Sequence, residues 1–199
     1  EVTEKIVADF SNEQHRGVLR SIPYEYENGK KVRIDYESAV DAEGNSWSVD
    51  PYIEYGYLNI PMKTHDDSYS SEIETFILKY TVDNAINYFP DENRDEFYWN
   101  VNGTDWPVKT NSVTATIHLP KEVEVQLKCY TGEYGAEGYD CKWQQDGKTI
   151  NFLTTRNFEQ YENLTVVIGL PHGILQEPSL IKKAWWILLD NKGILIAPL

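Results

Sequence analysis

Short stretches in which apolar and polar residues alternate run through the whole sequence, and they constrain the fold more than any other feature. Successive side chains of a strand point to opposite faces, so alternation predicts strands with one buried face and one exposed face. Nine stretches show this pattern: residues 2–10, 32–40, 52–60, 73–82, 97–101, 113–119, 123–130, 149–155 and 164–170. This number of short strands predicts an all-β fold, an antiparallel β-sandwich of the jelly-roll or immunoglobulin-like type.

Turn-forming residues separate these stretches and favour antiparallel pairing. Asn28-Gly29, Asn102-Gly103 and Asp146-Gly147 are dipeptides that accept the positive φ angles of tight hairpin turns. Asp146-Gly147 lies between two strand-like runs, 142–145 and 148–153, and predicts a hairpin there. Aromatic residues make up 13% of the chain, and their enrichment also favours strands.

The last 21 residues differ from the rest and predict a short helix that leads toward a membrane segment. Ser179 can cap a helix over 179–191, and Gly193 lies just beyond its end. Lys182 and Lys183 precede Trp185 and Trp186, and these residue types gather at membrane interfaces. We therefore expect a β-sandwich domain over 1–178, and a helical tether with the start of a membrane helix over 179–199. The alternative is a core helix or hairpin that closes the domain.

Two cysteines, Cys129 and Cys141, flank a loop rich in Gly, Tyr and acidic residues. A disulfide between them would restrict this loop in the unfolded chain, and it would imply an oxidising compartment. The alternative is a pair of free thiols in the cytosol. No combination of His and Cys has the spacing of a metal site, which favours the disulfide.

The net charge of −14 excludes nucleic acid as a partner, because the chain repels phosphate groups. The same charge repels anionic lipid surfaces. It is compatible with cationic partners or metal ions, although an acidic surface is also a common route to solubility.

Four segments together resemble the N-terminal domain of the predicted membrane proteins catalogued as domain of unknown function 2207. They are residues 15–23, 77–82, 95–108 and 115–120. The most distinctive is the core E-x-YWN-x-x-G-x-x-W, which begins at Glu96 and ends at Trp106. The resemblance extends from about Val2 to the C-terminus, with a departure at Ser70-Ser71. It implies a signal peptide, this outer domain, membrane helices and a cytoplasmic tail, and it implies no catalytic activity.

An acidic turn before the strand at 97–101 offers candidate calcium ligands. Asp91, Asn93 and Asp95 alternate as oxygen ligands do in a calcium loop. Glu96 stands where an EF-hand requires Gly, so the segment is not an EF-hand. The alternative is a solvated acidic turn, and we expect no other cofactor.

Two carboxylates near the distinctive core could serve glycoside hydrolysis, which requires a pair of them about 5–9 Å apart. Glu96 and Asp105 flank the Asn102-Gly103 turn and are the candidates. The alternative reading is that they are surface charges or bind backbone groups.

Aromatic and basic side chains supply candidate ligand-binding residues. Trp106, Tyr98 and Asn100 could form a platform for a sugar ring, whereas Trp99 is expected in the core. Arg16 and Arg20 could clamp a carboxylate ligand or pair with acids of the protein itself.

These observations favour a non-catalytic interaction or sensing domain on the extracytoplasmic face of the cell membrane. The expected partner is an envelope glycan or another envelope component, or a partner protein, with membrane attachment through helices that follow the domain. The alternatives are an extracellular glycoside hydrolase and a structural spacer or assembly domain.

Overall fold

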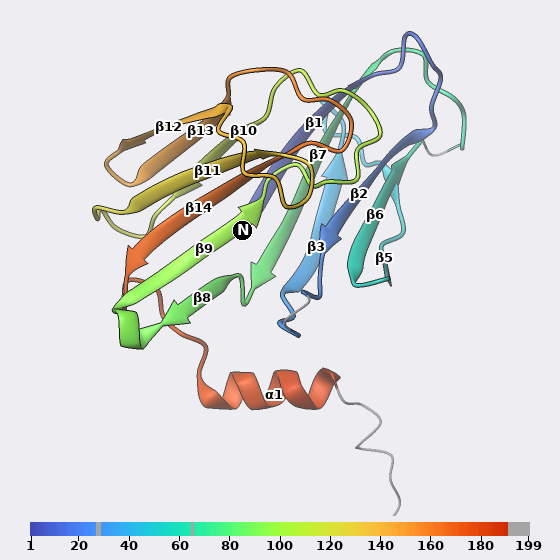
Figure 1. Cartoon of the computed structure of the whole chain (residues 1–199). Coiled ribbons are helices and arrows are strands. Elements are labelled where there is room, and N and C mark those ends of the chain that lie inside the picture. Colours follow the sequence, from blue (N-terminus) through green and yellow to red (C-terminus); the bar gives the residue numbers. More distant parts are fainter. Residues whose placement is uncertain (27–28, 65, 191–199) are drawn as a thin grey trace, which may run out of the picture.

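A computed structural model describes residues 1–26, 29–64 and 66–190 of the protein. Figure 1 shows a β-sandwich with helix α1 lying across one end. All strand pairs are antiparallel, as the sequence predicted.

The first half of the chain forms two sheets. One has the order β1-β7-β3 and the other β2-β6-β4, with β5 also paired to β6. Their strands are β1 (Val2–Asp9), β2 (Gly17–Pro23), β3 (Arg33–Val40), β4 (Ser48–Val49), β5 (Tyr52–Glu54), β6 (Tyr57–Lys63) and β7 (Ile73–Asp83).

The second half forms two more sheets, with the orders β11-β14-β9-β8 and β10-β13-β12. Their strands are β8 (Ile86–Phe89), β9 (Arg94–Asn100), β10 (Thr114–His118), β11 (Gln126–Gly132), β12 (Cys141–Asp146), β13 (Thr149–Thr154) and β14 (Asn163–Pro171). A short 3-10 helix, η1 (Pro90–Glu92), joins β8 to β9.

The buried apolar side chains form one cluster to which all four sheets contribute. Tyr80 of β7, Ile60 of β6, Leu164 of β14 and Phe152 of β13 are each at most 1% exposed. The alternation explains this core, since β1 directs every second residue inward and exposes the others. The two halves are therefore joined by a continuous core.

The strand predictions are confirmed with one exception. Residues 52–60 were expected as one strand, but Tyr55 and Gly56 adopt positive φ angles of 50° and 80° and end β5 there. The chain turns back at this point and pairs β5 with β6. The hairpin at Asp146-Gly147 is confirmed, because Asp146 faces Thr149 in the β12–β13 pair.

Helix α1 (Leu180–Asp190) confirms the helix expected near the C-terminus. The Ser179 hydroxyl accepts a hydrogen bond from the Lys182 amide at 3.2 Å, which caps the first turn. No residue of α1 is buried, so it is not a core helix. Among the described residues, no helix has the length and hydropathy that a bilayer crossing requires. The apolar run expected to begin a membrane helix, 194–199, lies outside the described residues.

Candidate functional site

The loop that follows β9 carries the distinctive core of the sequence, and its polar groups are used to hold the fold together. The Asn102 carboxamide accepts a hydrogen bond from the Leu164 amide at 2.9 Å and donates one to the Glu162 carbonyl at 3.0 Å. The Gly103 amide donates to the Asn163 side chain at 3.0 Å. These bonds fix the loop against the start of β14.

Trp106 belongs to the same network. Its indole nitrogen donates to the Asn102 carbonyl at 2.7 Å, and its own carbonyl accepts from the Tyr161 amide at 2.8 Å. The side chain is half-buried, and a role for Trp106 in sugar binding stays a prediction.

Arg20 lies beneath this loop and is 1% exposed. Its guanidinium donates to both carboxylate oxygens of Glu4, at 2.7 and 3.0 Å. It also donates to the carbonyls of Ser21 and Val101, at 2.6 and 3.1 Å. Arg20 thereby connects β1, β2 and the end of β9, and its positive charge pairs with Glu4 inside the protein.

Tyr80 completes this buried cluster, since its hydroxyl donates to Glu4 at 2.5 Å. Burial raises the pKa of Tyr80 far above its usual value, and the Glu4 carboxylate raises it further. The phenol therefore remains a hydrogen-bond donor throughout the physiological pH range.

Gly103 closes over the cluster and leaves no space for a side chain. Its φ is +80°, and a Cβ atom there would lie 2.6 Å from a guanidinium nitrogen of Arg20. Only glycine accepts both the backbone conformation and the close approach. The Asn102-Gly103 dipeptide was predicted as a turn. In the structure it also covers the buried ionic cluster of Arg20, Glu4 and Tyr80.

Three further predicted site residues are Arg16, Asp105 and Glu96. Arg16 forms an exposed ion pair with Asp67 at 2.9 Å and lies over the Tyr69 ring. Asp105 is exposed in the loop after β9, whereas Glu96 lies within β9 and pairs with Arg94 at 2.8 Å.

The three candidate calcium ligands in the acidic turn around η1 lie in different surroundings. Asp91 is exposed in η1, and Asn93 ends it in a left-handed conformation. Asp95 is fully buried, where its carboxylate lies 2.8 Å from His172 Nδ1 and accepts the Gly173 amide at 3.2 Å. Within the described ranges, no three His, Cys, Asp or Glu side chains are grouped as metal ligands would be.

Two adjoining hollows lie on the outer face of the sheet β11-β14-β9-β8, and Glu96 and Tyr98 border both. Their volumes are about 190 and 250 Å³. Tyr98 is 42% exposed, while Trp99, the next residue, is 8% exposed and lies in the core, as the alternation predicted. Asp105 lines neither hollow, so the structure does not place it with Glu96 in one cleft.

The register of the sheet explains the larger hollow. Gln126 of β11 and Glu96 of β9 both lie opposite Gly169 of β14. Because Gly169 has no side chain, a gap opens between the two longer neighbours. Lys128 and Tyr98 stand in the adjacent row, on either side of Val167.

The segment between β2 and β3 borders the smaller hollow with Tyr26 and Lys30. The Lys30 ammonium donates to the Asn87 side chain at 2.6 Å, and burial lowers its pKa. Burial also raises the pKa of Tyr26, with a smaller contribution from Tyr98. The two halves of the protein therefore meet at this hollow.

Asn100 lies on the same side of β9 as Tyr98 but is engaged within the sheet. Its side-chain oxygen accepts hydrogen bonds from Thr165 at 2.9 Å and from Asn163 at 3.2 Å. Of the predicted ligand-binding residues, Tyr98 alone lines these two hollows.

Sequence reasoning missed the other lining residues, most of which come from segments far from β9 in the chain. The alternation in 123–130 and 164–170 identified these strands, but it did not reveal that β14 lies next to β9 and β11 lies next to β14 in the same sheet. The missed lining residues with polar side chains are Tyr26, Lys30, Asn87, Arg94, Gln126, Lys128 and Tyr130.

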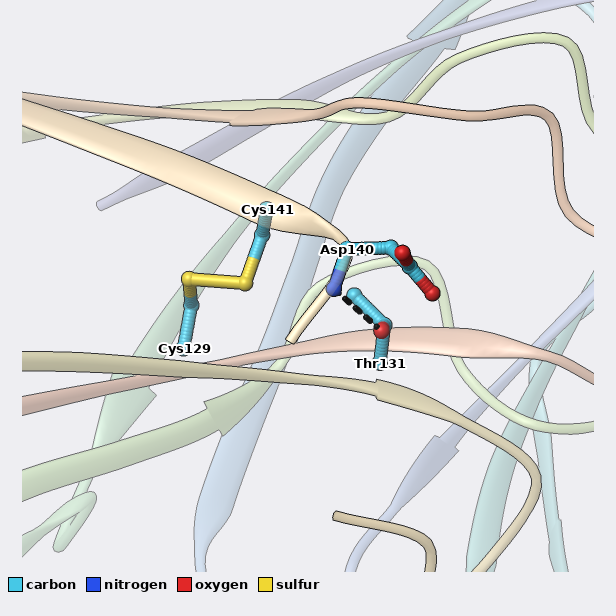
Figure 2. The surroundings of a disulfide bond; sticks show 4 residues. All are labelled: Cys129, Thr131, Asp140 and Cys141. Carbon is cyan, nitrogen blue, oxygen red and sulfur yellow. Dashed lines mark hydrogen bonds between the residues drawn. A yellow bond between two sulfur atoms is a disulfide. The ribbon is translucent and has the colours of Figure 1, made fainter. Parts of the chain in front are cut away.

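The disulfide between Cys129 and Cys141 is confirmed, and it joins β11 to the start of β12 (Figure 2). The two Cα atoms are 6.4 Å apart. Beside it, the Thr131 hydroxyl accepts a hydrogen bond from the Asp140 amide at 3.1 Å. The bridge therefore ties one sheet of the sandwich to another, and it suggests a location outside the reducing cytoplasm.

Comparison with curated proteins gives no match. A family model does match residues 1–170, and its description is the N-terminal domain of a predicted membrane protein, DUF2207. The match covers the fourteen strands of the described residues except for Pro171, the last residue of β14, and it ends before α1. The chain therefore belongs to the DUF2207 N-terminal domain family of predicted membrane proteins.

Proposed function

We propose that this protein is a non-catalytic recognition domain on the extracytoplasmic side of a membrane. Its ligand is a sugar chain of the cell envelope, which binds across the outer face of the sheet β11-β14-β9-β8. The observation that carries the proposal is the exposed Tyr98 ring, which stands between two hollows with polar linings.

The chemistry of the lining suits a carbohydrate. A pyranose ring has an apolar C–H face that packs on an aromatic ring, and hydroxyl groups around its edge that need hydrogen-bond partners. Tyrosine supplies such a surface at a low cost in conformational entropy. Gln126, Glu96 and Lys128 surround the Tyr98 ring with donors and acceptors.

The charge of the lining favours an acidic sugar chain. The protein has 32 acidic and 18 basic residues, yet the described lining contains three cations and one carboxylate. The cations are Lys30, Arg94 and Lys128, and the carboxylate is Glu96. A sugar carrying carboxylate groups would place its charges against Lys128, which is exposed.

The acidic residues of the lining favour sugar binding over glycoside hydrolysis. A glycoside hydrolase of the usual type requires two carboxyl groups across the scissile bond. Glu96 is the single acidic residue in the lining of the described hollows, and its carboxylate is engaged by Arg94.

The test is a binding titration of the chain against matched acidic and neutral oligosaccharides of envelope type. We expect Tyr98→Ala to weaken binding at least about tenfold, since it removes the stacking surface. Tyr52→Ala is the matched control, because Tyr52 is 45% exposed on β5, outside both hollows.

Lys128→Gln should reduce the preference for acidic over neutral oligosaccharides while the stacking surface stays intact. Equal binding by the wild type and by Tyr98→Ala, or no binding to any oligosaccharide, would refute the proposal. Release of sugar products by the wild type would instead support the hydrolase alternative.

A further inference from the structure

Helix α1 is attached to the domain by its polar side. Lys182 forms an ion pair with Asp83 at 2.8 Å, and Asp190 forms one with Arg33 at 2.6 Å. Arg33 and Asp83 face each other at the end of the β3–β7 pair. Two neighbouring positions of one sheet therefore hold α1 at points eight residues apart, which is about 12 Å along the helix.

Further contacts support this attachment. Trp186 lies between the two anchors on the same side of α1, and the Arg33 guanidinium is 5.9 Å from its ring centroid. The hydrogen bond from Arg33 to Asp190 raises the pKa of the guanidinium and stabilises its charged form. The docked side of α1 is thus specified by charge and by aromatic contact.

The opposite side of α1 is apolar and exposed. Leu180, Ile181, Trp185 and Leu188 are 82%, 83%, 60% and 43% exposed. At 3.6 residues per turn they occupy, with Ala184, about 140° of the helix circumference without a charged residue among them. A surface helix of a soluble protein places such a stripe against its core, whereas α1 turns it outward.

We propose that α1 lies flat on a lipid surface, with this apolar stripe at the boundary between headgroups and acyl chains. The domain would then stand on the membrane with the Arg33–Asp83 end of the sandwich nearest the lipid. Figure 1 shows α1 crossing that end of the sandwich. The proposal is independent of the sugar-binding site.

Trp185 and the charges of the protein indicate that the apolar stripe of α1 binds a lipid surface with little net charge. Trp185 is exposed within the stripe, and tryptophan side chains concentrate at the membrane interface. The lysines of α1 are neutralised within the protein, Lys182 by Asp83 and Lys183 by Glu177. With a net charge of −14, attachment must rest on apolar burial and not on attraction to anionic headgroups.

The experiment is flotation of the 199-residue chain with vesicles of phosphatidylcholine, and with vesicles that also contain phosphatidylserine. We expect binding to phosphatidylcholine vesicles, and weaker binding when phosphatidylserine is added. Ile181→Glu and Leu188→Glu should each lower the partition coefficient at least about tenfold. Ile73→Glu is the matched control, because Ile73 is 66% exposed at the opposite end of β7.

Circular dichroism would verify that each variant keeps the β-rich fold. The proposal is overturned if the wild type ignores phosphatidylcholine, if it requires phosphatidylserine, or if the control loses as much binding as the two α1 variants. It is also overturned if the wild type is a dimer that Ile181→Glu dissociates, since a second copy would then cover the stripe.

Discussion

Replacing Arg20 by Met should destabilise the protein more than most single substitutions, because Arg20 is the centre of a buried ionic cluster. The substitution keeps much of the apolar length of the side chain but removes four hydrogen bonds. Two of these bonds go to Glu4, and the others go to the carbonyls of Ser21 and Val101.

The magnitude follows from what remains after the substitution. Glu4 keeps its hydrogen bond from Tyr80 but loses its counter-ion in a site where its side chain is 14% exposed. Breaking a buried pair by removing one partner typically costs about 3–5 kcal/mol. The second substitution Glu4→Gln removes the unpaired charge and preserves an acceptor for Tyr80. We therefore expect Arg20→Met to cost about 3–5 kcal/mol, and the double variant to recover about 1–3 kcal/mol of that.

The assay is equilibrium unfolding in urea at pH 7, followed by tryptophan fluorescence, on the wild type, both single variants and the double variant. The double-mutant cycle isolates the coupling between the two side chains. A cost below about 1 kcal/mol for Arg20→Met, or additive costs in the double variant, would show that the cluster does not act as a unit.

Three further perturbations test other parts of the structure by the same unfolding assay. Gly103→Ala should cost roughly 2–4 kcal/mol, because the left-handed backbone penalises a Cβ atom that also meets the guanidinium below it. An unchanged unfolding midpoint would refute that close approach. Arg156 holds the pKa of Glu162 below its usual range by hydrogen bonding, so the stabilisation is present above the ordinary glutamate value and is lost as the pH falls through the lower, folded value. Glu162→Gln should therefore cost about 1 kcal/mol at pH 7, with the difference from wild type closing below about pH 4, and a constant difference would contradict this. The paired substitutions Cys129→Ala and Cys141→Ala should lower the free energy of unfolding by about 3 kcal/mol, and reduction of the wild type should reproduce the loss.

The fold was predictable from the sequence wherever a strand has one solvent-exposed face and one buried face. The alternation in 2–10 and 149–155 specifies inward and outward residues directly, and the structure follows it in β1 and β13. β2 (Gly17–Pro23) was missed as a strand because the buried Arg20 interrupts its apolar face. A charged side chain at an inward position interrupts the apolar–polar alternation. Its place in the core can be recognised only when its ion-pair partner is known.

The candidate site was predictable only in part, because a sheet face combines residues that the sequence separates. Tyr98 could be identified from its aromatic ring and from its alternation with Trp99. Lys128 could not, since nothing local indicates that β11 and β9 flank the same strand. At Trp106 the structure adds a contact that the sequence did not reveal, because the indole nitrogen donates a hydrogen bond to a carbonyl of its own loop.

The hydrogen bond from Arg20 to the Val101 carbonyl spans 81 positions, which has a consequence for the order of folding. During synthesis the β2–β6 and β1–β7 pairs can form before the second half of the chain is made. At that stage the Arg20 guanidinium lacks the Val101 carbonyl as a partner, and Gly103 does not yet cover it. Such long-range closure slows folding, because loop entropy must be lost before the contact is gained. The first half should therefore remain loosely packed until the second half arrives.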